Sequence, residues 1–267
     1  MDKDSKTSAA NDWNAVQYLK FERERTQPSR DLAARIELEM PSRILDIGCG
    51  PGNSTQVLRE RFPSADILGI DSSPDMIGRA RKQYPELTFD SVSLTPDCVE
   101  IVGTYDVIFS NACLQWIPEH ERLLFRLYEK LNPRGVLAVQ IPMTSDMPVS
   151  SILGEMSDDS PWAEKIRACH EHDLFTYRPE EYYDILSGIT DQFTIWQTFY
   201  MHPMNSCAEL VKWYCGSRLR PYLAGLTPEE RSGFLADIEL RFRQYYRPRA
   251  NGRIVIQFPR LFMVVNA

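Results

Sequence analysis

Residues 43–53, RILDIGCGPGN, decide the fold that the sequence predicts. The first five of them form a short apolar run typical of a buried strand, and glycines at positions 48, 50 and 52 follow directly. A helical pattern then runs over residues 55–62 and stops at Pro63. A strand, a glycine turn and a helix in this order are typical of the first unit of a doubly wound α/β sheet, which binds its ligand at the carboxyl ends of the strands.

The same alternation of apolar runs and helical patterns continues along the chain. Parallel strands are predicted at residues 66–70, 88–92, 105–110 and 136–141. Two more strand patterns, at residues 193–200 and 260–265, stand among helical patterns at residues 208–223 and 228–246. The sequence thus predicts a mostly parallel, seven-stranded sheet of the Rossmann-like type. Helices inserted in the C-terminal half would form a cap over its carboxyl edge.

Composition narrows the class of protein. The chain has 267 residues and a net charge of −7, and no apolar run approaches the roughly 18 residues that a membrane helix needs. We therefore expect a cytoplasmic protein that binds neither membranes nor nucleic acid, since phosphate binding needs clustered basic residues. From Met201 onward, however, ten basic residues stand against five acidic ones. That excess predicts either a local anion site or a solvated, arginine-rich helix face.

The acids around the glycine loop indicate what the loop binds. Asp46 stands two residues before Gly48, where a carboxylate would repel a pyrophosphate and attract an ammonium group. The third glycine is too close to the second for the G-x-G-x-x-G pattern of dinucleotide sites. Asp71 ends the second predicted strand, where it could accept hydrogen bonds from ribose hydroxyls. These features favour S-adenosylmethionine over a nicotinamide dinucleotide, and over a glycine turn with no ligand.

Longer motifs carry a resemblance to a known family. ILDIGCGPGNST, GIDSSPDMI, YDVIFSNACLQWIPEH and LNPRGVLAVQ resemble, in this order, the motifs of class I methyltransferases. DWNAVQYLKFERERTQP, EEYYDILS, IWQTFYMHPM, RLRPYLAGL and FPRLFMVV are similar to the trans-aconitate methyltransferase family, over residues 12–265. The resemblance implies that the chain binds S-adenosylmethionine and releases S-adenosylhomocysteine.

The resemblance also implies roles for individual residues. The positions that it assigns to the cofactor are Asp46, Gly48, Gly50, Asp71, Ser72, Met76, Ser93 and Asn111. Gln115 and Trp116 follow the fourth predicted strand, where such enzymes bring cofactor and substrate together. Two departures stand out. Ser93 replaces an acid that the family uses on the adenine, unless a shifted register lets Asp90 compensate, and Pro142-Met143-Thr144 replaces a proline followed by Asp-Asn at the substrate rim.

The expected chemistry needs cations and no base. A carboxylate acceptor is ionised at neutral pH, so the protein has only to hold and align it. Arg220 and Arg260 are the first candidates for this catalytic task, because a guanidinium can grip a carboxylate with two hydrogen bonds. The further candidates for substrate binding are Tyr18, Arg25, Arg218 and Tyr182. No metal is expected, since His170 and His172 would point to different faces of a helix.

The chain is expected to consist of a tail, a cofactor-binding core, a cap and a final strand. We expect a disordered tail at residues 1–12, a cofactor-binding core at 13–142, a helical cap and substrate region at 143–250 with one core strand at 193–200, and a final core strand at 251–267. The leading hypothesis is a carboxyl O-methyltransferase that converts a small polycarboxylate such as trans-aconitate to a monomethyl ester.

The alternatives keep the cofactor and change its use. One is methylation of another small acid, an acyl-carrier-bound acid or a hydroxylated metabolite, and another is a catalytically silent, cofactor-binding regulatory protein. An NAD-dependent oxidoreductase is the least favoured. The partner expected is a small molecule, and the sequence leaves monomer and homodimer open.

Overall fold

The computed structural model describes residues 26–145, 147–169, 174–216 and 218–267, and only the backbone of Arg220. The tail expected at residues 1–12 lies outside these residues. Seven strands are described: β1 (Arg43–Ile47), β2 (Asp66–Asp71), β3 (Thr88–Ser91), β4 (Tyr105–Asn111), β5 (Leu131–Pro142), β6 (Phe193–Met204) and β7 (Ile254–Asn266). They form one sheet in the order β3-β2-β1-β4-β5-β7-β6.

The sheet is parallel except for β7, which runs antiparallel to both β5 and β6. The first five strands pair in parallel, with β1 at the point where the order of strands reverses. In such sheets the crevice beside that point, at the carboxyl ends of the strands, is the ligand site. The predicted seven-stranded, mostly parallel, doubly wound fold is confirmed.

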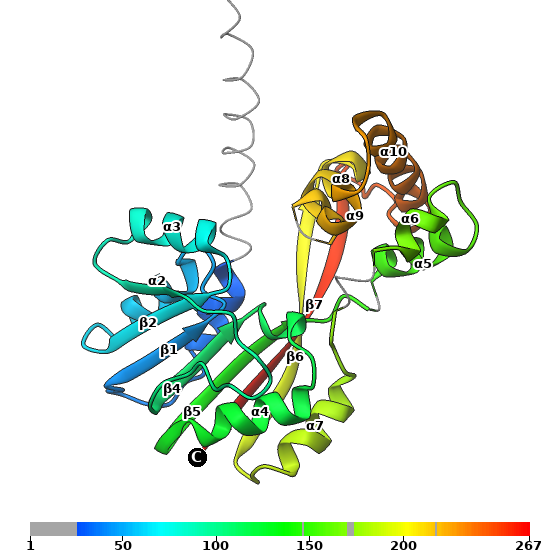
Figure 1. The fold of residues 1–267 in the computed structure, drawn as a ribbon. Helices are drawn as coiled ribbons and strands as arrows, with labels where there is room; N and C mark the ends of the chain where they lie inside the picture. The colour runs from blue at the N-terminus through cyan, green and yellow to red at the C-terminus, as the bar shows by residue number, and fades with distance from the viewer. Residues whose placement is uncertain (1–25, 146, 170–173, 217) are drawn as a thin grey trace, which may run out of the picture.

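Helices cover both faces of the sheet, as Figure 1 shows. Their bounds are α2 (Asn53–Arg61), α3 (Pro74–Gln83), the short 3-10 helix η1 (Leu114–Trp116), α4 (His120–Glu129), α5 (Pro148–Asp158), α6 (Ala163–Arg167), α7 (Pro179–Ser187), α8 (Cys207–Cys215), α9 (Arg220–Ala224) and α10 (Pro228–Tyr245). A helical segment at residues 26–33 packs with α2 on one face. On the other face α4 and α7 bury Leu123, Leu127 and Leu186.

The last two strands are longer than the sequence patterns predicted. Residues 199–204 of β6 pair with 254–259 of β7 beyond the edge of β5, so the two strands leave the sheet as a two-stranded ribbon (Figure 1). Pro259 explains where β7 leaves β5. Its carbonyl accepts a hydrogen bond from the N–H of Met143 at 3.0 Å, but proline has no N–H to return, and β5 ends at Pro142.

The ribbon carries a helical region with a hydrophobic core of its own, which we call the cap. Its buried residues come from α5, α8, α10 and the ribbon, and include Trp213, Tyr214, Phe234 and Phe242. The single helix predicted at residues 208–223 is two helices in the structure, α8 and α9, because α8 ends at Gly216. The predicted helix at 228–246 is α10, which starts with a capping box of Thr227 and Glu230.

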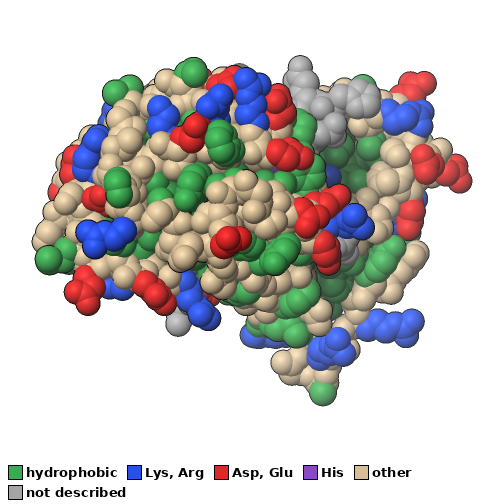
Figure 2. Space-filling model, turned by 90° about the horizontal axis from the view of Figure 1, so that it is seen from below, with side chains coloured by type: hydrophobic (Ala, Val, Ile, Leu, Met, Phe, Trp, Pro, Cys, Tyr) green, Lys and Arg blue, Asp and Glu red, His purple; other side chains and the backbone are tan. Residues whose placement is uncertain are grey.

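The helices and the charged side chains bear on whether the protein could bind a membrane or nucleic acid. Among the described residues, no helix is both long and apolar enough to cross a membrane. On the face drawn in Figure 2, acidic and basic side chains are interspersed around apolar ones. That face therefore presents no continuous basic surface of the kind that binds nucleic acid.

Candidate functional site

A cavity of about 540 Å³ lies at the carboxyl ends of β1, β2 and β4. Most of the predicted cofactor residues line it, together with Trp116; these are Gly48, Gly50, Asp71, Ser72, Met76, Ser93 and Asn111. Thr26 and Ser29 of the helical segment at residues 26–33 also contribute to its wall. The cavity is thus at the ligand position expected of a doubly wound sheet.

The glycine loop crosses the floor of the cavity. Its three glycines, Gly48, Gly50 and Gly52, all have positive φ, and the first two line the cavity. A Cβ on Gly48, at φ +74°, would lie 2.2 Å from the Cβ of Cys113, so this glycine allows the loop to pack against the segment after β4. A Cβ on Gly50, at φ +55°, would have nothing within 4 Å. Gly48 is therefore required by protein packing, and it also lines the cavity. Gly50 leaves open space for a ligand.

Asp71 is fixed in the wall by backbone donors. Its Oδ2 accepts a hydrogen bond from the N–H of Gly50 at 3.0 Å, and its Oδ1 accepts one from the N–H of Ser73 at 2.8 Å. A carboxylate oxygen can accept more than one hydrogen bond. The side chain is therefore held rigidly while both oxygens keep capacity for two neighbouring hydroxyl groups.

Asp46 lies behind the loop and is fully buried, so it is not part of the cavity wall. Its Oδ2 accepts hydrogen bonds from Ser54 Oγ at 2.7 Å and Thr55 Oγ1 at 2.6 Å. Burial raises its pKa to about 6, against the lowering effect of these two hydroxyls, and the charge of Asp71 raises it further. Oδ1 has no hydrogen-bond partner in the described part of the chain. A buried carboxylate with one unpaired oxygen beside the cavity favours a ligand whose nearest group is a cation.

Ser93 lines the cavity at the position where the family that the sequence resembles has an acid. Asp90 does not compensate. It is exposed, its Oδ1 accepts the N–H of Ser91, and it lies 4.0 Å from Arg81 as a loose ion pair. The register therefore leaves a hydroxyl, not a carboxylate, at this end of the cavity.

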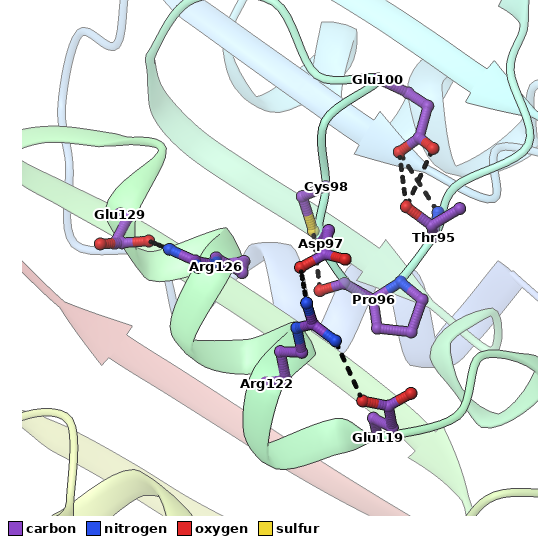
Figure 3. Close-up of polar contacts among 9 residues, drawn as sticks. All are labelled: Thr95, Pro96, Asp97, Cys98, Glu100, Glu119, Arg122, Arg126 and Glu129. Atoms are coloured by element: carbon purple, nitrogen blue, oxygen red, sulfur yellow. Dashed lines mark hydrogen bonds and ion pairs between the residues drawn. The ribbon is translucent and has the colours of Figure 1, made fainter.

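The loop that follows Ser93 is attached to α4, as Figure 3 shows. Asp97 forms an ion pair with Arg122 at 2.5 Å, and Arg122 also lies 3.4 Å from Glu119. Within the loop, Thr95 Oγ1 donates to Glu100 at 2.9 Å. These exposed contacts are individually weak, but together they hold the wall segment after β3 against the rest of the core.

The residues at the end of β4 and just after it form another part of the cavity wall. Asn111 ends that strand, and its Oδ1 is buried with no hydrogen-bond partner among the described residues. Trp116 lines the cavity with 46% of its surface exposed. Gln115 is buried, donates from Nε2 to the Ala112 carbonyl at 2.8 Å, and does not reach the cavity wall. Asn111 and Trp116 are thus brought together at the cavity, and Gln115 supports the turn beneath them.

Arg260 lies outside the cavity wall, two strands from β4. It is 8% exposed, its Nη1 donates to Gln140 Oε1 at 3.1 Å, and its guanidinium lies 4.6 Å from the centre of the Phe258 ring. Sequence reasoning missed Gln140. A glutamine in the middle of the apolar run of β5 was the available signal, because a buried amide needs a partner.

Tyr182 is not brought to the cavity. It is fully buried in α7, and its hydroxyl donates to His120 Nδ1 at 2.6 Å, while His120 Nε2 donates to the Leu114 carbonyl at 2.9 Å. Burial raises the pKa of Tyr182 and lowers that of His120. Tyr182 is therefore not placed to contact a ligand in this cavity. The physical reason is that the α7 pattern packs this face on the sheet, where the tyrosine hydroxyl supports η1 through His120.

The remaining candidates are in or near the cap. Arg218 lies between α8 and α9, half-buried, and Arg220 is the first residue of α9. Neither belongs to the cavity wall, and the side chain of Arg220 is not described. Tyr18 and Arg25 lie outside the described residues, as do His170 and His172. Within the described ranges, no group of three or more His, Cys, Asp or Glu side chains could hold a metal ion.

The residues that meet at the cavity fit S-adenosylmethionine. Asp71 offers acceptors to a pair of ribose hydroxyls, and the open side of Gly50 leaves room for the ligand chain. The unsatisfied oxygen of Asn111 in the wall and that of Asp46 behind the loop are acceptors, which suit an ammonium group and do not suit a phosphate. This set of acceptors therefore matches the ammonium group at the amino-acid end of this cofactor.

Comparison with known proteins gives the same result. A family model described as a methyltransferase domain matches residues 18–187. A trans-aconitate 2-methyltransferase of Rhodopseudomonas palustris (strain BisA53) is 41% identical over 255 residues, which are 96% of this chain and 99% of that protein. One from Variovorax paradoxus (strain S110) is 37% identical over 255 residues, 96% of this chain and 98% of that protein.

Solved structures support the fold alone. The YcgJ protein of Bacillus subtilis superposes with a TM-score of 0.56 at 14% identity, covering 90% of this chain and 98% of that one. A protein from Bacillus halodurans C-125 superposes with a TM-score of 0.60 at 11% identity, covering 89% and 97%. With the family model and the near full-length relatives, the chain belongs to the S-adenosylmethionine-dependent methyltransferases, in the family of the trans-aconitate 2-methyltransferases.

Proposed function

We propose that this methyltransferase esterifies one carboxylate of a small polycarboxylate such as trans-aconitate, and that Arg260 binds the acid. The observation that carries the proposal is the position of Arg260. It is a buried cation at the carboxyl edge of the sheet, hydrogen-bonded to Gln140, and Gln140 is paired in register with Asn111 of the cavity wall. Adjacent strands are about 4.8 Å apart, so roughly 10 Å separates Arg260 from that wall. A polycarboxylate is long enough to span this distance.

The chemistry asks for alignment of the acceptor and removal of water. When bound, S-adenosylmethionine supplies an electrophilic methyl group for in-line displacement by an acceptor oxygen. Asp71 would hold the ribose and Asp46 would attract the ammonium group of the cofactor, while Asn111 and Trp116 line the same cavity. Arg260 would bind a carboxylate of the substrate other than the one that reacts, and thereby place the reacting oxygen without reducing its charge.

No general base is needed for this reaction, and the buried His120 beside η1 is not arranged as one. Both ring nitrogens of His120 are engaged, with Tyr182 and with the Leu114 carbonyl. Its pKa is lowered by burial. A hydroxyl acceptor would need a base, so this arrangement favours an acid.

We propose that the cap and the segment joining it to β5 complete the substrate side, consistent with a division into a core at 13–142 and a cap region at 143–250. Thr144 is buried at the start of that segment, and its Oγ1 has no hydrogen-bond partner among the described residues. Arg218 and Arg220 would add positive charge from the cap. Met143 and Thr144, where the family has other residues, would then tune which acid is accepted.

The test is a methyl-transfer assay with labelled S-adenosylmethionine and a panel of di- and tricarboxylates that includes both aconitate isomers. We expect base-labile label on trans-aconitate, because a methyl ester releases methanol on alkaline treatment and an ether does not. Label on no acid, with S-adenosylhomocysteine binding intact by calorimetry, would overturn the substrate assignment and leave the family in place.

A second arm tests the arginine. Arg260→Ala should raise the KM for the acid about 10-fold to 100-fold, the loss expected for a charge-assisted pair, with the affinity for S-adenosylhomocysteine unchanged. Arg249→Ala is the control, since Arg249 is an exposed arginine of the same basic C-terminal region. Equal KM values for the two variants would remove Arg260 from the substrate site.

A further inference from the structure

The described residues of the cavity wall include a single charged side chain, that of Asp71. Asp46 lies behind the loop and not in the wall. By β3, Asp90 and Arg81 pair loosely with each other at 4.0 Å, and neither of them lines the cavity. Within the described wall, a ligand therefore meets charge at one point only, and its other contacts are with neutral groups.

The order of the strands indicates which part of the wall faces the base of the cofactor. The sheet edge runs β3-β2-β1-β4, with Asp71 at the end of β2 and Asn111 at the end of β4. Adjacent strands are about 4.8 Å apart, so roughly 10 Å separates the acceptor for the ribose from the acceptor for the ammonium group. With the amino-acid end at β4 and the ribose at β2, the base extends over the end of β3.

The segment that leaves β3 forms this part of the wall. The N–H of Val92 donates to the Asp71 carbonyl at 3.0 Å, so Ser93 follows close to the proposed ribose acceptor. Val92 and Leu94 line the cavity and pack against the hydrophobic cluster that contains Ile117, which lines the cavity as well. Apolar side chains of this kind suit the faces of a purine ring.

The polar side chains at this end of the cavity are hydroxyls. Ser73 caps α3, since its Oγ accepts the N–H of Met76 at 3.4 Å, whereas Ser72 and Ser93 are exposed. A site rejects an analogue that lacks one polar group when a buried partner is left unpaired. An exposed hydroxyl both donates and accepts, and water satisfies it when the ligand brings no partner. No such penalty is therefore expected at Ser93.

We propose that Ser93 sets the base selectivity of this cofactor site: the purine is bound through apolar contacts, and its 6-amino group is not selected. The site then also admits S-nucleosyl derivatives of methionine and homocysteine whose purine carries hydrogen in place of that amino group. The inference rests on the assignment of the cavity to the cofactor and does not depend on which acid is methylated.

The test is calorimetric binding of S-adenosylhomocysteine and of its analogue with hydrogen at purine position 6. The wild-type protein should bind the analogue no more than about tenfold more weakly, the loss expected for one neutral hydrogen bond. Ser93→Asp provides an ionised acceptor for the amino group and should widen the ratio of the two affinities to about 100-fold. Ser93→Ala removes the hydroxyl and should narrow the ratio to within about twofold.

Ser91→Asp is the matched control. Ser91 is exposed at the end of β3, lies outside the described cavity wall and receives the same charge. Its ratio of affinities should equal that of the wild-type protein. Folding of every variant is checked by the melting temperature. If Ser93→Asp does not fold, the wild-type ratio and that of Ser93→Ala decide the question.

The outcomes separate this inference from the assignments around it. A wild-type ratio of 100-fold or more would show that another group binds the amino group, and the proposal would be overturned. A ratio in Ser93→Asp equal to that of Ser91→Asp would place the base elsewhere, with the same consequence. If S-adenosylhomocysteine itself did not bind, the cofactor assignment would fail and this inference with it. A trans-aconitate assay without product would affect the substrate proposal alone.

Discussion

Asp71 shows how a single residue can be both structural and ligand-binding. Its two oxygens already accept hydrogen bonds from the backbone N–H groups of Gly50 and Ser73. We predict that Asp71→Ala weakens S-adenosylhomocysteine binding by about 1.5–3 kcal/mol, the usual loss for hydrogen bonds to a charged group. Isothermal titration calorimetry measures this directly. Asp75→Ala, an exposed acid paired with Arg79 on α3, should change the affinity little; equal losses in the two variants would contradict the ribose assignment.

The raised pKa of Asp46 should make the stability of the ligand-free protein depend on pH. In the folded protein it is raised to about 6 from 3.8, so between these values the native state holds more protons than the unfolded one. The stability of the ligand-free protein should therefore fall as the pH rises from about 4 to about 6, by up to about 3 kcal/mol, and then level off. Urea unfolding across this range checks the sign.

The same group should make cofactor binding depend on pH in the opposite sense. An ammonium group is attracted by the ionised carboxylate, which is lost below about pH 6. Affinity for S-adenosylhomocysteine should decline as the pH falls below that value, up to about tenfold per pH unit. Asp46→Asn should bind more weakly and show a flat profile. A profile that stays unchanged in Asp46→Asn would mean that another group causes it.

At the scale of elements, η1 is held by α7 through a buried pair of side chains. Tyr182→Phe removes the hydroxyl that donates to His120 Nδ1 and leaves a buried acceptor without that donor. We predict a loss of about 1–3 kcal/mol in the free energy of unfolding, with the KM for the acid little changed. Chemical denaturation and steady-state kinetics of this one variant decide between the core role and a substrate contact, which would change KM and leave stability intact.

The strands show how much of the fold the sequence patterns could predict. The strands β1, β2, β3 and β4 were predicted within a residue or two, because each is a short segment between turn residues. Three of them are apolar runs, whereas in β3 only Phe89 is buried. The ribbon formed by β6 and β7 was not predicted, since Pro203 and Pro259 end the strand pattern. Pro203 lies on an edge strand, and Pro259 lies where β7 leaves β5, positions at which the missing N–H has little effect on the ladder.

In the site, too, residues fixed by the local chain could be predicted, and residues fixed by distant contacts could not. Residues whose role depends on the backbone of the first βα unit, such as Gly50 and Asp71, were placed by the motif, because the chain around them is local. Gln140 and Tyr182 depend on which distant strands and helices meet. Nothing in their sequence neighbourhood specifies that Gln140 reaches Arg260 or that Tyr182 reaches His120.

For the whole molecule, the separate hydrophobic core of the cap predicts that cap and sheet can be destabilised independently. Phe234→Ala, at a buried position in α10 against Trp162, should cost about 3–5 kcal/mol of local stability. We expect faster amide exchange in α5, α8 and α10, little change in β1 to β4, retained cofactor binding and a raised KM for the acid. Exchange that rises equally throughout the chain would show that cap and core unfold as one unit.

The position of β7 also has a consequence for synthesis on the ribosome. It follows β5 and β6 in the chain but lies between them in the sheet, with hydrogen bonds to both. Until it emerges, the edges of β5 and β6 have no partner, and such edges are prone to pair with other chains. We expect nascent chains stalled before Ile254 to bind chaperones and to aggregate on release, because the sheet closes only when its last strand is inserted.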